Sequence, residues 1–343
     1  MKTNPFQKPS SLKDLAGDLG LSVATVSLAL NGRGKTVGLS DATIDRVLRH
    51  ARQAGYSPDP RARSLRTRRS NVVGVLFPHL RNNWAQDILD GMTDLLEERR
   101  LVPFLANHRG DPRREAAEIA SLVQRQAAGI LCSPLDRSLP TYRHVLSQRI
   151  PLVFFGDTLA SLPDASYAAW TPEAVSIAVR HLLAVGCRRI AFLGAHDPRH
   201  LARERFQAYR QTLTDAGVPP HDAWILHPRR PGALPRRLLA LFRRRSPPDA
   251  LFCLYNTDAM RALDLFREHG VRVPDEVCVA TLADDPLCGP RAYDLTVVTA
   301  PVRDEGREAA RILLQLLQQP DSAPVHRLVP GGTLIPRSSS LKH

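Results

Sequence analysis

Short apolar runs alternate with amphipathic stretches from residue 71 to residue 284, and this alternation limits the possible folds more than any other feature. The run VVGVLFP precedes a helical pattern at 84–100, and LVPFLAN precedes another at 113–127. Short apolar runs bounded by turn residues are typical of buried strands, whereas apolar residues at helical spacing are typical of amphipathic helices. Strands that alternate with helices predict an α/β fold in which helices cover both faces of parallel sheets.

The remaining strand and helix units lie on either side of one interruption. Before the interruption come the apolar run GILCSP, a helix around 142–148 and the apolar run IPLVFFGD. After it come four units of one helix and one apolar run each: 172–185 with RIAFLGA, 201–216 with AWILHP, 233–244 with DALFCLY, and 257–269 with VCVATLAD. We expect the break near residues 165–171 to divide these units into two lobes, because there are too many for one small sheet.

The stretch SLKDLAGDLGLSVATVSLALNG at 11–32 predicts two short helices joined by a tight turn. Ser11 and Asp14 have the spacing of a capping box for the first helix, and Gly20 allows a left-handed turn. Ser22 is then expected to cap the second helix. This is the plan of a helix-turn-helix.

In the second helix, Val26, Ala29 and Leu30 are expected to face inward. The residues expected near its exposed N-terminal half are Val23, Ala24, Thr25, Ser27 and Leu28. The second helix of a helix-turn-helix presents its first residues to base edges in the major groove. We therefore predict that this stretch reads DNA. After the polar loop 33–39, Ser40 is expected to cap a third helix that completes a DNA-binding domain over residues 1–58.

The segment YSPDPRARSLRTRRS at 56–70 has two interpretations. Asp59 and Pro60 are a good helix start, and the following residues would form about two turns, which are marginal unless something holds them. In this interpretation residues 59–70 are a hinge helix, and Leu65 is an apolar wedge for the minor groove within an arginine run. In the other interpretation the segment is a solvated basic linker.

Charge and composition favour a polyanionic partner and exclude some other classes. The chain carries a net charge of +13, and its first seventy residues hold thirteen Lys or Arg against five Asp or Glu. The five cysteines are scattered, so neither a metal site nor disulfides are expected. No apolar run is long enough to span a membrane, and the start MKTNPFQKPSS lacks a signal-peptide core, so we expect a cytoplasmic protein.

In family order, several phrases resemble LacI/GalR-type bacterial transcription regulators. They are SLKDLAGDLGLSVATVSLALNG, AGYSPDPRARSLRTRRSNVVGVLFP, HLLAVGCRRIAFLGA, RFQAYRQTL, GVRVPDEVCVATL, LTVVTAP and GGTLIPRSSS. The resemblance implies a three-helix head, a hinge helix and a core like periplasmic sugar-binding proteins, whose two lobes clamp a small ligand. It also implies a homodimer on a pseudo-palindromic operator. The expected core is 71–343, with lobe 1 at about 71–168 and 297–328 and lobe 2 at about 169–296 and 329–343.

The resemblance also assigns DNA contacts. Ser22, Thr25 and Ser27 match positions that contact phosphates or bases, and Val23 and Ala24 match the two positions that most often set base choice. Leu28 stands where many members have a base-reading arginine or histidine; a leucine there is limited to apolar contact such as a thymine methyl. The minor-groove wedge is matched by Leu65, flanked by Arg63 and Arg66.

For the effector, Arg205 matches the arginine that usually grips a polar group of the ligand. The other expected effector residues are Asn82, Trp84, Asp157, Trp170, Tyr255, Asn256 and Asp284. Several depart from the family pattern by loss of acids and gain of aromatics, which indicates either a ligand flatter or more apolar than a sugar, or a cleft no longer used. Arg205 as a surface ion pair, and Trp84 or Trp170 as lobe packing, remain alternatives.

These observations lead to a DNA-binding transcription regulator, most often a repressor in this family, whose operator affinity is controlled by a small effector between the lobes. The alternative is a regulator that binds DNA without a small effector. A solute-binding protein fits the core but not the basic head. An enzyme is not expected, because the sequence has no Gly-x-Gly-x-x-Gly after the first strand, no Walker loop and no Gly-x-Ser-x-Gly elbow, and no cofactor is implied.

Overall fold

The computed structural model describes residues 11–30, 32–56, 70–80, 83–194, 200–226 and 233–341. The chain divides into two compact units, Met1–Ser70 and Asn71–His343, which we call the head and the core. Of the predicted hinge 59–70, residues 59–69 lie outside the described residues. None of the described helices is long and apolar enough to cross a membrane.

The described part of the head holds the helices α1 (Leu12–Leu19), α2 (Val23–Leu30) and α3 (Asp41–Gln53), with a turn of 3-10 helix at Lys35–Val37. The predicted capping box is confirmed: the Ser11 hydroxyl accepts a hydrogen bond from the backbone N–H of Asp14, whose carboxylate accepts one from the N–H of Ser11. Gly20 ends α1 in the left-handed conformation, at φ 63°. The helices enclose a small core of their own, made of Leu15, Ala16, Val26, Ala29, Val47 and Ala51.

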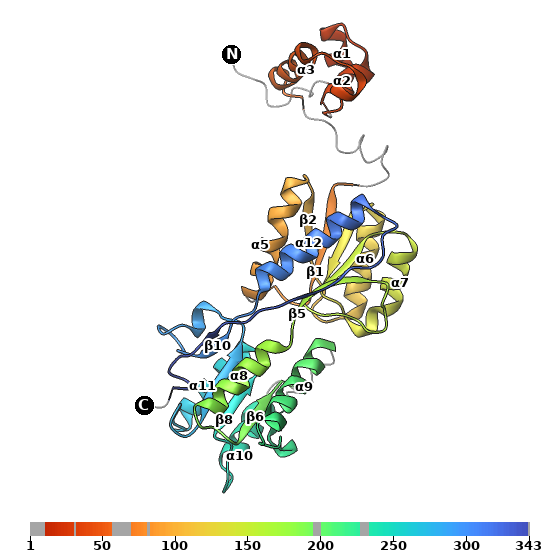
Figure 1. Cartoon of the computed structure of the whole chain (residues 1–343). Helices are drawn as coiled ribbons and strands as arrows, with labels where there is room; N and C mark the ends of the chain where they lie inside the picture. The colour runs from red at the N-terminus through yellow and green to blue at the C-terminus, as the bar shows by residue number, and fades with distance from the viewer. Residues whose placement is uncertain are drawn as a thin grey trace. The chain divides into compact units, whose positions relative to one another are not determined.

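The first lobe is built on a parallel sheet with the strand order β11-β5-β4-β3-β1-β2 among the described residues. The strands are β1 (Val72–Phe77), β2 (Val102–Asn107), β3 (Gly129–Cys132), β4 (Leu152–Phe155), β5 (Ser166–Trp170) and β11 (His326–Val329). One face packs on α5 (Asn83–Glu98) and α12 (Val302–Gln318), and the other packs on α6 (Pro112–Gln124) and α7 (Leu139–Ser147) (Figure 1).

The second lobe has the strand order β12-β10-β9-β8-β6-β7. These strands are β6 (Ile190–Leu193), β7 (Ile225–Leu226), β8 (Ala250–Cys253), β9 (Cys278–Leu282), β10 (Thr296–Val298) and β12 (Leu334–Ile335). Only β12 is antiparallel to its neighbour among these described strands. Helices α8 (Glu173–Ala184) and α9 (His200–Asp215) pack on one face, and α10 (Ala233–Phe242) and α11 (Asn256–Glu268) pack on the other.

Two details differ from the expectation. The interruption expected near 165–171 contains a strand, because residues 166–170 form β5, which pairs with β4 and β11; the two lobes divide just after it. The boundary expected at residue 297 is also too early, because β10 (Thr296–Val298) pairs with β9 and β12 in the second sheet. The chain therefore returns to the first lobe only after Val298. It crosses once more between β11 and β12.

Helices α5 and α12, which lie side by side in Figure 1, touch through two glycines. A Cβ atom on Gly306 would lie 2.1 Å from the carbonyl oxygen of Ile88, and one on Gly91 would lie 2.0 Å from that of Arg303. Glycine is therefore required at both places, since the backbones themselves are in contact. Asp94 of α5 pairs with Arg303 and Arg307 of α12 at the rim of this contact.

We predict that Gly306→Ala lowers the free energy of unfolding of the core by about 1–3 kcal/mol, because the added methyl group forces the two helices apart. Gly17→Ala is the control: Gly17 lies in α1, and a Cβ there would have no neighbour within 4 Å. That change should leave the core transition unchanged. Urea unfolding followed by circular dichroism measures both, and equal core transitions in wild type and Gly306→Ala would contradict the backbone contact.

Candidate functional site

The first two residues of α2 face solvent, and the start of the helix is capped. The Ser22 hydroxyl accepts a hydrogen bond from the backbone N–H of Thr25 at 3.0 Å, which caps the helix. Val26 and Ala29 are buried in the head core. Val23 is 44% exposed and Ala24 is exposed. The predicted base-reading pair therefore stands on the open side of a rigid helix.

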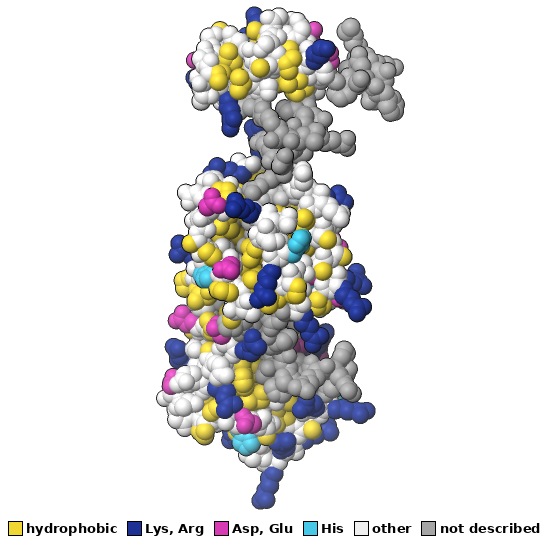
Figure 2. Space-filling model, turned by 90° about the vertical axis from the view of Figure 1, so that its right-hand side faces the viewer, with side chains coloured by type: hydrophobic (Ala, Val, Ile, Leu, Met, Phe, Trp, Pro, Cys, Tyr) yellow, Lys and Arg dark blue, Asp and Glu magenta, His cyan; other side chains and the backbone are white. Residues whose placement is uncertain are grey.

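The other expected DNA contacts are less open or lie outside the described residues. Thr25, Ser27 and Leu28 are half-buried. Arg63, Leu65 and Arg66, together with the expected effector residue Asn82, lie outside the described residues. On the face drawn in Figure 2, Lys and Arg side chains are spread over the core rather than gathered in one patch.

Asp157 joins the two lobes of the core. It follows β4 in the first lobe and is 1% exposed. Its Oδ1 atom accepts hydrogen bonds from the backbone N–H of Thr158 at 2.8 Å and from that of Leu201 at 2.9 Å. Leu201 lies in the first turn of α9, where the helix dipole favours a negative charge. The carboxylate thus anchors the start of a second-lobe helix.

Arg205 lies one turn further along α9 and contacts Trp170, the last residue of β5. The guanidinium carbon is 4.0 Å from the centre of the Trp170 ring, a close cation–π contact. Arg205 is 7% exposed and Trp170 is 5% exposed. Arg205 is therefore buried rather than on the surface, and it meets Trp170 where the chain leaves the first sheet.

Glu305 completes this group, and sequence reasoning missed it. Its side chain on α12 is fully buried, and its Oε1 atom accepts a hydrogen bond from the backbone N–H of Gly156 at 2.7 Å. Burial raises the pKa of the carboxyl from 4.5 to about 8; the Gly156 N–H and the Arg205 charge oppose the rise, and Asp157 adds to it. We call Asp157, Trp170, Arg205 and Glu305 the interlobe cluster.

One signal in the sequence would have found Glu305. The inward face of α12 is formed by Val302, Glu305, Gly306, Ala309, Ala310, Ile312 and Leu313, which follow helical spacing. An acid on such a face is unusual, because a buried carboxyl needs partners.

Trp84 packs within the first lobe beside this group. Its ring centroid is 5.9 Å from that of Phe77 and 6.0 Å from that of Phe155. Gly156, at φ 73°, lets the Trp84 ring approach, since a Cβ there would lie 2.7 Å from the ring. This geometry favours the lobe-packing interpretation of Trp84.

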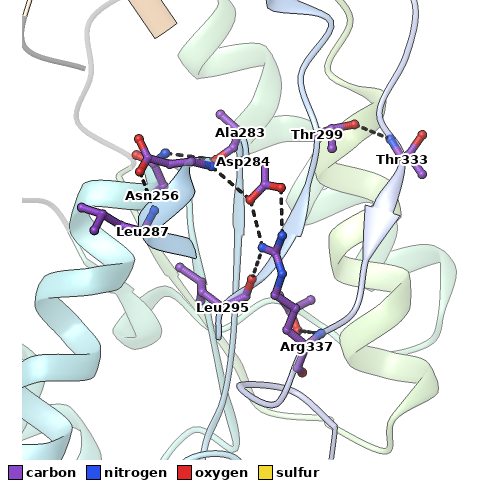
Figure 3. Close-up of polar contacts among 10 residues, drawn as sticks. Asn256, Ala283, Asp284, Leu287, Leu295, Thr299, Thr333 and Arg337 are labelled. Atoms are coloured by element: carbon purple, nitrogen blue, oxygen red, sulfur yellow. Dashed lines mark hydrogen bonds and ion pairs between the residues drawn. The ribbon is translucent and has the colours of Figure 1, made fainter. Parts of the chain in front are cut away.

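Two of the remaining expected effector residues, Asp284 and Asn256, lie in a second group beside Arg337. Both oxygens of Asp284 accept hydrogen bonds from the Arg337 guanidinium at 2.9 Å, and Arg337 also donates to the carbonyl oxygen of Leu295 (Figure 3). The Asn256 amide donates to the carbonyl oxygen of Ala283 at 3.0 Å. Tyr255, half-buried, precedes α11. The polar groups of Asp284 and Asn256 thus hold loops of the second lobe together.

A separate cavity of about 420 Å³ opens after β1 and β2 and is lined by His79, Leu80, Asn107 and Arg109. These are not the residues expected to bind an effector. Among the described residues, no group of three or more His, Cys, Asp or Glu is arranged to hold a metal ion.

Glu305 should make the stability of the protein depend on pH. Between pH 4.5 and about 8 the folded protein keeps a proton that the unfolded chain releases, so this group lowers the stability as pH rises through that window. We predict that Glu305→Gln gains stability relative to wild type by about 2–4 kcal/mol between pH 5 and pH 8. Chemical denaturation of both proteins at the two pH values tests this. If the unfolding free energies of the two proteins differed by the same amount at pH 5 and at pH 8, Glu305 would have the same pKa in the folded protein as in the unfolded chain.

Comparison with known proteins agrees with this architecture. Residues 179–340 match the model of the periplasmic binding protein-like domain. The chain is 26% identical to the transcriptional repressor PurR of Vibrio parahaemolyticus over 317 residues, which cover 90% of this chain and 92% of that protein.

Two solved structures cover nearly the whole chain. The lac repressor dimer bound to operator and the anti-inducer ONPF matches with a TM-score of 0.81 and 21% identity, over 98% of this chain and 100% of that chain. A LacI family transcriptional regulator from Silicibacter pomeroyi matches with a TM-score of 0.72 and 25% identity, over 97% and 100% of the two chains. With its helix-turn-helix head and two-lobed core, the chain is similar over nearly its whole length to LacI family bacterial transcription regulators.

Proposed function

We propose that this protein is a sequence-specific DNA-binding transcription regulator, acting as a repressor, whose operator affinity is controlled by a small effector bound between the core lobes. The observation that carries the proposal is the helix α2, which presents Val23 and Ala24 from a head with a core of its own. Such a helix fits the major groove of B-DNA. The relatives named as repressors support the same role. A protein that reads the chromosome works in the cytoplasm.

A homodimer on a pseudo-palindromic operator would explain why the edge strand of the first sheet has exposed apolar side chains. Strand β2 is an edge strand, and its Val102, Phe104 and Leu105 are exposed. An apolar edge strand is a template for a second chain. Two heads in one dimer would place two copies of α2 on successive half-sites.

The interlobe cluster supplies the route for control. Asp157 holds the start of α9, and Arg205 of the same helix contacts Trp170, so an effector that alters either contact changes how the lobes close. An effector that weakens operator binding must in turn be bound more weakly by the operator-bound protein.

A regulator that binds DNA without a small effector is the second candidate. It is favoured by the second group, because Asp284 is bound by Arg337 and Asn256 is bound to the Ala283 carbonyl. These side chains then serve the second lobe rather than a ligand.

The DNA-binding role is tested by Ala24→Asp in the full chain. A carboxylate in the first turn of α2 suits the helix dipole, so folding should persist, whereas its charge repels the DNA. We expect wild type to select a pseudo-palindromic site from randomised duplexes and to bind it less tightly as salt increases. Ala24→Asp should lose about 100-fold or more in affinity for that site in fluorescence anisotropy.

Ala117→Asp, which adds the same charge to an exposed position of α6 in the core, is the matched control and should bind as wild type does. Equal affinities for all three proteins, or no selected site for wild type, would refute the proposal.

The wedge proposed for Leu65 has a separate test. Leu65→Ala removes the side chain that would open the minor groove but leaves the arginines, so affinity for the selected site should fall far more than affinity for random DNA. Titration of both duplexes at one salt concentration gives the two losses. An equal loss of affinity for the selected site and for random DNA would favour the interpretation of this segment as a solvated basic linker.

A further inference from the structure

Glu305 has one carboxyl oxygen engaged and one that lacks a partner. Oε1 accepts the hydrogen bond from Gly156, whereas Oε2 is buried and has no hydrogen-bond partner in the described part of the chain. A buried acceptor without a partner is rare, because burial removes water without replacing it. Oε2 is therefore a carboxyl oxygen without a partner at the place where α12, the end of β4 and α9 meet, and it accepts a hydrogen bond when the carboxyl is ionised and donates one when it is protonated.

The surroundings of this acceptor restrict what it can take. Asp157, which follows Gly156 in the sequence, accepts hydrogen bonds from two backbone N–H groups. The Arg205 guanidinium lies on the Trp170 ring. The charges of Arg205 and Asp157 both act on the Glu305 carboxyl in the interlobe cluster. A cationic N–H donor entering here would stabilise the ionised form of Glu305 and satisfy Oε2, whereas an anion would be repelled by Asp157 and would keep Glu305 protonated.

We propose that Glu305 is a specificity-determining residue of the effector site: a cationic N–H donor of the effector favours the ionised carboxylate, whose Oε2 atom then accepts its hydrogen bond, so that Glu305 and Asp157 together select amine-bearing ligands over anions. This inference rests on the proposed binding of an effector between the lobes. The half-buried ring of Trp84, which lies against Gly156, gives this place an aromatic surface for a flat ligand.

The raised pKa of Glu305 adds an independent readout. At neutral pH much of this carboxyl holds a proton, and a protonated amine that binds beside it stabilises the charged form. The charged groups that act on it among the described residues are Arg205 on α9 and Asp157 after β4. Binding of an amine should therefore release protons, and binding of a neutral alcohol should not.

The test uses three probes with one ring and different charge: benzylamine, benzyl alcohol and benzoate. Each is titrated into the full chain at constant ionic strength and followed by tryptophan fluorescence, and proton release is measured by calorimetry in two buffers of different ionisation enthalpy. We expect wild type to bind benzylamine about tenfold or more tightly than benzoate, with benzyl alcohol between them. Glu305→Gln, which keeps the acceptor for Gly156, should bring the ratio close to one and abolish proton release.

Glu308→Gln is the matched control, because Glu308 lies on the same helix and pairs with Arg311 and Arg327 outside the cluster. It should keep the wild-type ratio. Benzoate binding as tightly as benzylamine, no binding of benzylamine to wild type, or an unchanged ratio in Glu305→Gln would each overturn the inference. Salt-sensitive DNA binding is measured on the same samples. If wild type does not bind DNA, the proposed function itself is contradicted; if it binds DNA but shows none of the expected ligand preference, only this inference fails.

Discussion

The backbone contact between α5 and α12 is the constraint on which the core depends. Gly91 and Gly306 let the two helices meet without side chains between them. Because α12 is drawn in this far, the residue before Gly306 cannot reach solvent, and its carboxyl meets the end of β4 at Gly156. That loop continues into Asp157, which holds the first turn of α9 in the other lobe. One helix crossing in the first lobe therefore determines where the lobes touch.

Much of the fold follows from local patterns. The apolar runs predicted the central strands, since a strand buried on both faces must be apolar throughout. The caps at Ser11, Ser22 and Ser40 were equally readable, because a helix start depends on a few adjacent residues. Strand β5 escaped because SYAAW has little of the β-branched signal, and it is a strand only through its pairing with β4 and β11.

The sites were harder to predict than the fold, for a physical reason. Family position drew attention to Asp157 and Arg205, and the structure brings both to the lobe junction. It also assigned Asp284, whose carboxylate is occupied by Arg337 from a segment more than fifty residues away in sequence. Whether a polar side chain is available to a ligand depends on the partner it finds in the fold. Glu305 was missed for the converse reason, since its environment is created by α5 and α9.

The order in which the lobes are completed has a consequence for synthesis. Helix α12 and strand β11 belong to the first lobe but lie at 302–318 and 326–329, after most strands of the second lobe. On the ribosome the head emerges with its whole core before the sheet that follows it, whereas that sheet waits for its outermost strand and a covering helix until β6 to β10 of the second lobe have been made. The lobe that begins first is thus finished late, and a chain released early would carry an intact head on an incomplete core.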